Sequence, residues 1–300
     1  MKNISYRNVF LPVILMLLST CIQAQTEYIV RVDPNNGHIH KVDSIPGVTW
    51  LKGYETPAYS ERRSWFSFFG GDDPTGNPFY LFTVYGNTGS TIWNPYFPDH
   101  PLFVSMQYGR NTDVLYGGVR INSVSSIVSI DPVTSNYSVI HDLPGISSIL
   151  KLIVDDAHNR FYILGPDAVG TLKLFTVDMA NGNIILQPAT PRINNMVYNQ
   201  ATGVFYAISN RDAPGAPHPV IYSLCTVDPV SGTINNIADI PNIAGFVSGD
   251  ETLDENNGRY FFTASEWNIL GPFFIQSMST QVISFTRFLY LKTVVLPIII

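Results

Sequence analysis

The sequence predicts an all-β protein with the fold of a β-propeller, built from about six four-stranded blades. A turn motif recurs five times at spacings of 46 to 52 residues, and a proline follows each copy at a constant distance. Short β-rich runs separated by turn residues fill the intervals, and helical periodicity is absent after the first 24 residues. Four antiparallel strands per unit, repeated radially about every 40 to 50 residues, are typical of a propeller.

Four of the five copies of the turn motif are a β-rich run that ends in aspartate and a short polar turn, and the fifth has tyrosine at the aspartate position. The motif positions are Asp33, Tyr85, Asp131, Asp178 and Asp228, and each is followed thirteen residues later by proline, at positions 46, 98, 144, 191 and 241. An aspartate can bond the backbone amides beyond it, and a glycine four residues later tolerates positive φ. The motif therefore predicts a tight hairpin at the end of a strand. A sixth copy runs from position 284 to 297, with serine in place of the acid.

A second pattern lies upstream of the motif and predicts the other hairpin of each unit. Polar turns lead into aromatic runs at residues 155–162, 199–206 and 254–261. One unit then divides into four strands at residues 150–154, 160–164, 172–177 and 183–187.

These runs resemble the YVTN and NHL-type propellers of secreted and surface proteins, over nearly the whole chain after residue 24. The resemblance rests on turns such as VDPVSG at Asp228 and hairpins such as NRFY at Asn159. It implies six or seven blades around a channel, with ligands bound on one face. Its members include binding modules and enzymes, so no functional residue carries over.

Closure of the ring leaves two alternatives open. Residues 27–32 and 38–42 look like the two outer strands of a blade, which needs two inner strands from the C-terminus. Only Ile298, Ile299 and Ile300 follow Pro297, where the next inner strand should start. Either the chain is truncated and the propeller incomplete, or the tail closes the ring in another way. A truncated chain would leave an open strand edge and should be poorly soluble.

Residues 1–24 have the order of a secretory signal peptide, and residues 25–300 form the propeller domain. Lys2 and Arg7 precede an apolar run of about ten residues, and Ala24 offers a cleavage site. The run is too short to cross a bilayer, which takes about 20 residues, so no transmembrane segment is expected after cleavage. The minor alternative is a lipid anchor at Cys21. We expect a secreted, periplasmic or cell-surface protein.

Removal of this leader takes away two cations and no acid, which changes the formal net charge from −6 to −8. Phosphate binding needs clustered Lys and Arg, so a nucleic-acid partner is excluded. Cys225 is then the remaining thiol, and its apolar surroundings at residues 220–227 predict burial.

Catalytic signatures such as Gly-x-Ser-x-Gly and His-Glu-x-x-His are missing from the sequence, which favours a protein without enzymatic activity and without a cofactor. The alternative is a hydrolase or lactonase that holds Ca²⁺ at the channel mouth. Oxygen ligands for such an ion follow the repeat prolines, at Glu55, Asn194, Asn195, Asp250 and Glu251.

Aromatic residues supply the other candidate site. Fourteen of them lie between residues 47 and 97, including Trp50, Trp65 and Trp93. Rings exposed on a rim would bind a sugar or anchor a protein, whereas rings between blades would belong to the core. The main functional prediction is an exported propeller that binds a protein or glycan partner through one face.

Overall fold

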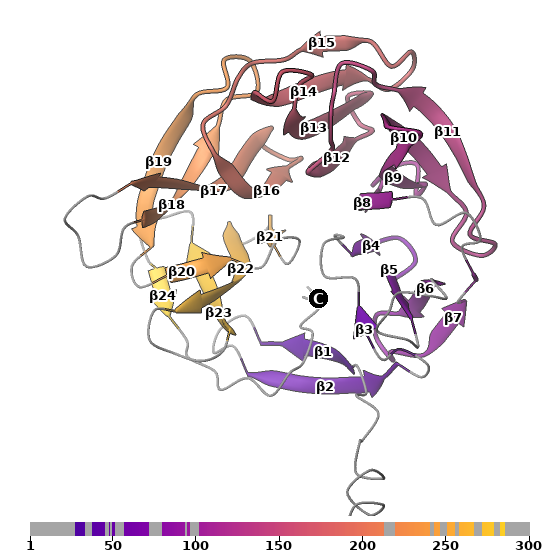
Figure 1. Ribbon diagram of the computed structural model, residues 1–300. Helices are drawn as coiled ribbons and strands as arrows, with labels where there is room; N and C mark the ends of the chain where they lie inside the picture. The colour runs from indigo at the N-terminus through magenta and orange to yellow at the C-terminus, as the bar shows by residue number, and fades with distance from the viewer. Residues whose placement is uncertain are drawn as a thin grey trace, which may run out of the picture.

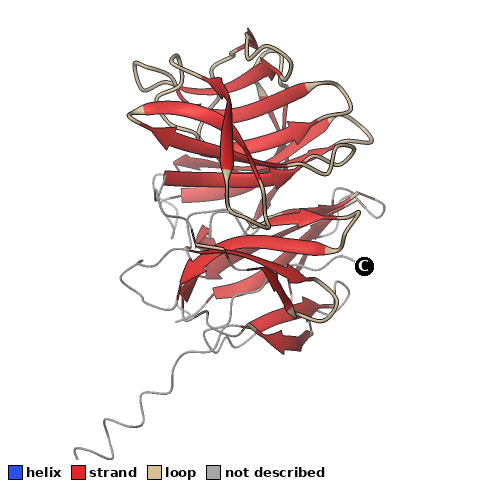
Figure 2. Ribbon diagram, turned by 90° about the vertical axis from the view of Figure 1, so that its right-hand side faces the viewer, coloured by secondary structure: helices blue, strands red, loops and turns tan. Residues whose placement is uncertain are grey.

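The computed structural model describes residues 28–33, 38–45, 48, 50–51, 57–71, 80–93, 95–96, 102–212, 220–240, 243–246, 251–255, 258–266, 272–278 and 283–285. In these ranges every regular element is a β-strand, and the strands form six sheets around a ring (Figure 1). A view from the side shows strands throughout the depth of the ring (Figure 2). The predicted all-β propeller of four-stranded blades is confirmed. The leader and the last fifteen residues, on which ring closure depends, lie outside the described ranges.

We number the sheets as blades 1 to 6 in chain order. Blade 1 contains β1 (Tyr28–Val32) and β2 (Ile39–Ser44). Blade 2 contains β3 (Trp50–Leu51), β4 (Ala58–Ser60), β5 (Trp65–Gly71), β6 (Tyr80–Tyr85) and β7 (Thr91–Trp93). Blade 3 contains β8 (Leu102–Tyr108), β9 (Leu115–Ile121), β10 (Val124–Ile130) and β11 (Tyr137–Asp142).

Blade 4 contains β12 (Lys151–Asp155), β13 (Arg160–Pro166), β14 (Leu172–Asp178) and β15 (Ile184–Leu186). Blade 5 contains β16 (Ile193–Asn199), β17 (Val204–Asp212), β18 (Val220–Val227) and β19 (Ile234–Ile240). Blade 6 contains β20 (Ile243–Phe246), β21 (Thr252–Asp254), β22 (Arg259–Glu266), β23 (Pro272–Met278) and β24 (Ile283–Phe285).

Strands within a blade pair antiparallel and in sequence order from the centre of the ring outwards (Figure 1). In blades 2 and 6 two short strands share the innermost position, because β3 and β4 both pair with β5, and β20 and β21 both pair with β22. In the described part of the chain blade 1 is a two-stranded sheet. The strands predicted for blade 4 agree with β12 to β15 to within two residues at each end.

Among the described residues the hydrophobic core forms five clusters, and each cluster joins two neighbouring blades. Alternate side chains of a strand point to opposite faces of its sheet, so one strand serves two clusters. Leu152 and Val154 of β12 pack toward blade 3, whereas Ile153 between them packs toward blade 5. The inner strands are therefore apolar at successive positions. Cys225 is fully buried between blades 4 and 5, as predicted.

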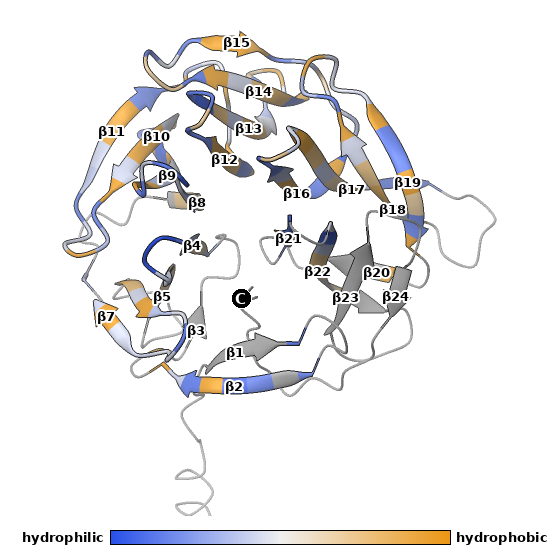
Figure 3. Ribbon diagram, turned by 180° about the vertical axis from the view of Figure 1, so that it is seen from behind, coloured by the Kyte–Doolittle hydropathy of each residue, from blue (hydrophilic) through white to orange (hydrophobic). Residues whose placement is uncertain are grey.

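The outer strands have a different pattern, because one of their faces meets solvent. Polar residues stand among apolar ones along β19, as the colours of Figure 3 show. Asn235 and Asp239 are exposed there, whereas Ile240 at the end of the strand is buried.

The motif residues Asp33, Tyr85, Asp131, Asp178 and Asp228 all lie at the end of the third strand of a blade or, in blade 1, at the end of β1. Their amides donate across the turn to the residue five positions later, over 2.8 to 3.0 Å. The carboxylates of Asp131, Asp178 and Asp228 also accept the amide two residues later, at 2.8, 2.8 and 2.9 Å. The predicted placement of the motif before a hairpin is confirmed.

The glycine that closes the motif also sets the contact between blades. Gly182 and Gly232 have φ angles of +74° and +73°. A methyl group at Gly182 would lie 2.7 Å from the ring of His141 in blade 3, and one at Gly232 would overlap the carbonyl oxygen of Ala189, just after blade 4. Each of these turns thus packs against the preceding blade. Blade 3 has Ser135 at this position, with φ of +59°.

Candidate functional site

Trp65 and Trp93 of the predicted aromatic site lie together in blade 2. Their rings contact edge to face, with centroids 4.9 Å apart and an interplanar angle of 76°. Both side chains are half-buried, so each ring is partly covered by neighbouring residues and partly exposed to solvent. The backbone of Trp50 belongs to β3 on the inner side of the same blade, and its side chain lies outside the described part of the structure.

Two further residues complete this group, which we name the aromatic cluster: Arg63, Trp65, Tyr85 and Trp93. The guanidinium of Arg63 lies 4.6 Å from the Trp65 ring centroid and forms an ion pair with Asp113 of blade 3. Tyr85 is the cross-strand partner of Trp65 and is 46% exposed. A cation over one ring and an exposed phenol beside it make a surface with apolar and polar parts.

The predicted metal ligands are not all in the described part of the structure. Glu55 and Asp250 lie outside it. Asn194 and Asn195 lie in β16, where the pairing with β17 shifts in register, and Asn195 has a φ of +50°. The carbonyl of Asn195 accepts the Tyr260 hydroxyl. Among the described residues no group of three or more His, Cys, Asp and Glu side chains is placed to hold a metal ion.

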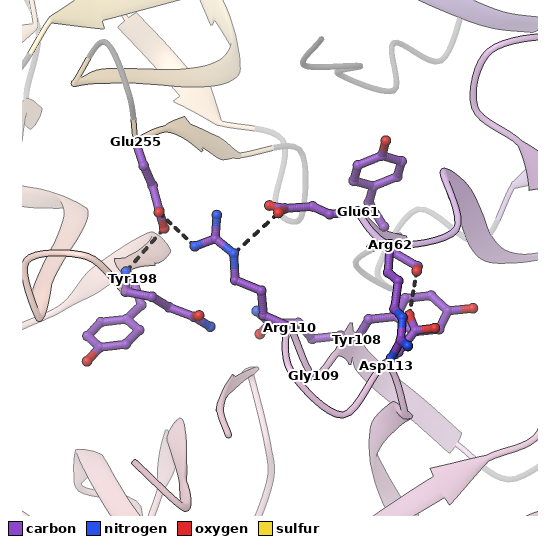
Figure 4. Close-up of a pocket in the computed structure, with 12 residues that line it drawn as sticks. Glu61, Arg62, Tyr108, Gly109, Arg110, Asp113, Tyr198 and Glu255 are labelled. Atoms are coloured by element: carbon purple, nitrogen blue, oxygen red, sulfur yellow. Dashed lines mark hydrogen bonds and ion pairs between the residues drawn. The ribbon is translucent and has the colours of Figure 1, made fainter. Parts of the chain in front are cut away.

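The channel opens on what we call the hairpin face, where the hairpins that follow the innermost strands lie. An ion-paired bridge crosses this mouth (Figure 4). Arg110, from the β8–β9 hairpin, donates to Glu255 of blade 6 at 2.8 Å and to Glu61 of blade 2 at 3.3 Å. The backbone amide of Gln200 in blade 5 donates to the other oxygen of Glu255. Hydrogen bonding to Glu255 raises the pKa of the Arg110 guanidinium above its ordinary value.

The hairpin that carries Arg110 is held from the next blade. Asp156 of blade 4 accepts the amides of Asn111 and Thr112 at 2.8 and 2.7 Å, and the Thr112 hydroxyl at 2.9 Å. Asp155 beside it is buried and accepts the hydroxyl of Tyr198 in blade 5 at 3.0 Å. Burial raises the pKa of Tyr198. Side-chain bonds between hairpins therefore join blades 3, 4 and 5 around the mouth.

Below the mouth lies a cavity of about 690 Å³, which we call the chamber. Side chains of the innermost strands β4, β8, β12, β16 and β21 line it. Lys151 and Glu251 form an ion pair in its wall, and the Glu251 side chain is 1% exposed. A metal ion bound by Glu251 would have to compete with this ammonium group for the carboxylate.

Sequence reasoning missed the residues of the bridge. One sequence feature does point to the mouth of the channel, namely the polar turn that follows an innermost strand. Asp155, Asp156 and Glu255 all belong to the predicted upstream hairpins. In the sequence the two aspartates indicate a turn, whereas in the structure they accept hydrogen bonds from residues of other blades. Arg110 had no sequence signal, because its two partners are 49 and 145 residues away.

No helix in the described ranges is long and apolar enough to cross a membrane.

Comparison with known proteins supports the architecture. No protein-family model matches the sequence, and no curated protein matches it. Similar solved structures include a putative TolB from Agrobacterium tumefaciens, with a TM-score of 0.60, 10% identity and coverage of 87% of each chain. TolB from Acinetobacter baumannii has a TM-score of 0.55 and 11% identity, over 89% of this chain and 64% of that one. The chain thus spans less than two thirds of the Acinetobacter protein.

Two other similar structures show that the fold serves different functions. A structure of the nidogen/laminin complex has a TM-score of 0.53 and 11% identity, over 81% of this chain and 87% of that one. An oligogalacturonate lyase in complex with manganese has a TM-score of 0.52 and 10% identity, over 84% and 70%. At these identities the likeness shows the fold alone: the chain has a propeller-repeat architecture, whereas membership of the YVTN or NHL families stays a prediction.

Proposed function

We propose that this chain is an exported, non-enzymatic β-propeller that binds a protein or glycan partner through one face. The aromatic cluster is the contact site in this proposal. The observation that carries it is the half-buried Trp65–Trp93 pair with Tyr85 exposed beside it. Trp and Tyr offer large contact areas at a small loss of side-chain freedom, and they dominate the energy of many interfaces.

The surroundings of the cluster support a binding role. Arg63 is fixed between the Trp65 ring and the carboxylate of Asp113, so the cluster is held by two blades. A site that is rigid before binding loses less entropy when the partner arrives. Among the similar structures, the nidogen/laminin complex is an example in which a protein of this fold is bound to a protein partner.

The test compares two tyrosines of equal exposure. Tyr85 is 46% exposed within the cluster, and Tyr96 is 45% exposed outside it. Binding of the Tyr85→Ala and Tyr96→Ala variants would be measured on a glycan array and by cross-linked pull-down from the source cell surface, with the identified ligand then titrated. We expect Tyr85→Ala to weaken binding by about 2 kcal/mol and Tyr96→Ala to leave it unchanged.

Thermal unfolding of Trp65→Ala and Trp93→Ala separates binding from packing. Loss of a purely structural ring should lower the melting temperature by several degrees, and binding should then fall only as far as folding does. Large destabilisation of both variants, with unchanged affinity of the folded fraction, would reject the cluster as the contact site.

Export is a separate part of the proposal. Cleavage after Ala24 would leave Gln25 as the first residue, whereas lipidation would leave Cys21. Intact mass of the protein recovered from the cell envelope or the medium decides between them. A chain that keeps Met1 and stays in the cytoplasm would contradict export.

The alternative proposal is a cation-dependent hydrolase or lactonase at the channel mouth. It rests on the oxygen ligands predicted from the sequence, Glu55 and Asp250 with an asparagine, since hard oxygen ligands suit Ca²⁺. Calorimetric titration with Ca²⁺, followed by assay of lactone hydrolysis with and without the ion, tests it. Hydrolysis that depends on Ca²⁺ would replace the main proposal.

A further inference from the structure

We propose that His38 and His40 form a binding site for a divalent transition-metal ion, of the Zn²⁺ or Cu²⁺ type, on the outer strand of blade 1. This site lies on a different blade from the aromatic cluster, and its nitrogen ligands distinguish it from the oxygen ligands of the Ca²⁺ alternative. The proposal rests on the positions of the two histidines, on the distance between their rings and on their exposure.

The two histidines stand at alternate positions of one extended segment. His40 belongs to β2, and His38 directly precedes that strand. The carbonyl of His38 accepts the Asp33 amide at 2.8 Å, so the pairing with β1 extends to this residue. Side chains two positions apart on a strand point to the same face. Both imidazoles therefore lie on one face of β2, which runs along the outside of the ring (Figure 1).

The spacing of the two rings fits a shared ion. Their centroids are 5.4 Å apart, with an interplanar angle of 60°. A Zn–N bond of about 2.0 to 2.1 Å places an imidazole centroid about 3.2 Å from the metal, so two rings at a tetrahedral angle have centroids about 5.2 Å apart. The rings in the protein are close to that separation, so the backbone holds them near the geometry that the ion requires.

Both imidazoles are accessible to an ion from solution, because His38 and His40 are exposed. The other histidines that the structure describes are placed differently. His141 is half-buried, and its Nε2 is hydrogen-bonded to a backbone carbonyl at 2.8 Å. His158 is exposed, and its Nδ1 lies 2.9 Å from the carboxylate of Asp155. Among the described histidines, those at 38 and 40 are the two whose rings are in contact.

The chemistry of the pair selects the class of ion. Imidazole suits Zn²⁺, Cu²⁺ and Ni²⁺, whereas Ca²⁺ and Mg²⁺ prefer oxygen ligands. The second nitrogen of each ring can keep a hydrogen bond while the first one ligates the metal. Two imidazoles fill two positions of a four-coordinate ion and leave the others to water or to a side chain of another molecule. A bound ion could therefore accept a ligand from outside the chain.

Calorimetric titration with Zn²⁺ alone tests the site, in the full chain with Cys21 replaced by alanine. We expect one ion per chain, and we expect His38→Asn and His40→Asn each to weaken binding by on the order of tenfold. The matched control is His158→Asn, which removes an exposed histidine outside the pair and should leave the affinity unchanged. Ca²⁺ should not compete with Zn²⁺.

A second variant separates the geometry of the pair from the number of histidines. The double variant His40→Asn/Lys41→His keeps two histidines on β2, but position 41 lies on the opposite face of the strand from His38. Its affinity for Zn²⁺ should fall to that of His40→Asn. With Cu²⁺, the electron paramagnetic resonance spectrum of the parent chain should show one more imidazole nitrogen bound to the metal than the spectrum of either single variant.

Two results would overturn the proposal. One is a parent chain that does not bind Zn²⁺ at millimolar concentrations. The other is binding that the His40→Asn/Lys41→His variant retains in full. The substituted side chains are exposed, so each variant should fold as the parent does. Thermal unfolding without metal checks this, and His38→Gln or His40→Gln replaces an asparagine variant that fails to fold.

Discussion

Blades 2 and 4 share the hairpin that leads into their outermost strands, β6–β7 and β14–β15, yet they present different surfaces there. In blade 4 the motif residue is Asp178, whose carboxylate accepts the amides of Ala180 and Asn181 at 2.8 and 3.2 Å. In blade 2 the equivalent residue is Tyr85, which has no carboxylate and extends a ring into solvent.

The two turns nevertheless keep the same backbone bonds. The amide of Tyr85 donates to Ser90 at 3.0 Å, and that of Asp178 donates to Asn183 at 2.9 Å. The closing glycine of each turn has positive φ and contacts the preceding blade. The comparison shows that the backbone hydrogen bonds and the glycine are enough to form this turn. The aspartate adds side-chain hydrogen bonds to it. The motif position is therefore free to carry a functional side chain.

The largest expected effect comes from the closing glycine of the same turn in blade 5, where an added methyl group would meet backbone atoms. Gly232→Ala forces a methyl group onto the Ala189 carbonyl at a positive φ, so we expect a loss of about 3 kcal/mol in the free energy of unfolding. Denaturant unfolding measures it. Gly170→Ala is the control, since Gly170 has a φ of +86° and open space around it. That variant should lose only about 1 kcal/mol, and equal losses would contradict the contact between blades.

A smaller effect sharpens the comparison at the motif position. Tyr85→Asp gives blade 2 the carboxylate that blade 4 has, positioned to accept an amide in the turn. We expect a gain of about 1 kcal/mol in stability, together with loss of partner binding. Unfolding and binding would be measured on one preparation. A variant that is less stable than the parent would show that Tyr85 contributes to packing.

The smallest effect concerns the protonation of the motif acid. The Ser231 hydroxyl and the Val230 amide hold the pKa of the Asp228 carboxyl below its ordinary value. A depressed pKa in the folded state stabilises the fold above the ordinary pKa of aspartate, and this contribution disappears as the pH falls through the lower, folded value. Asp228→Ala should therefore unfold more easily than the parent at pH 7, and the difference should shrink as the pH falls below 4. A difference that does not change with pH would rule out this origin.

Sequence reasoning predicted the repeat, the strands of blade 4 and the turns at Asp131 and Asp228, because each depends on residues within a few positions of one another. It also placed Trp65 and Trp93 in one candidate site, since both lie in a single aromatic segment. It did not decide whether the two rings pack between blades or are exposed on the rim. The half-buried pair with Arg63 above one ring depends on the neighbouring blade, which supplies Asp113.

The sequence by itself determined the period of the blades and the chemistry of the turns. Hydrogen bonds between an aspartate and the next amides, and the positive φ of a glycine, are local properties that the chain carries wherever it lies. Tertiary structure alone decided the channel. Arg110 meets Glu255 across 145 residues, and Lys151 meets Glu251 across 100, because the radial arrangement of the blades brings their innermost strands and hairpins together. A charge has no preferred partner in the sequence, and only the folded ring selects one.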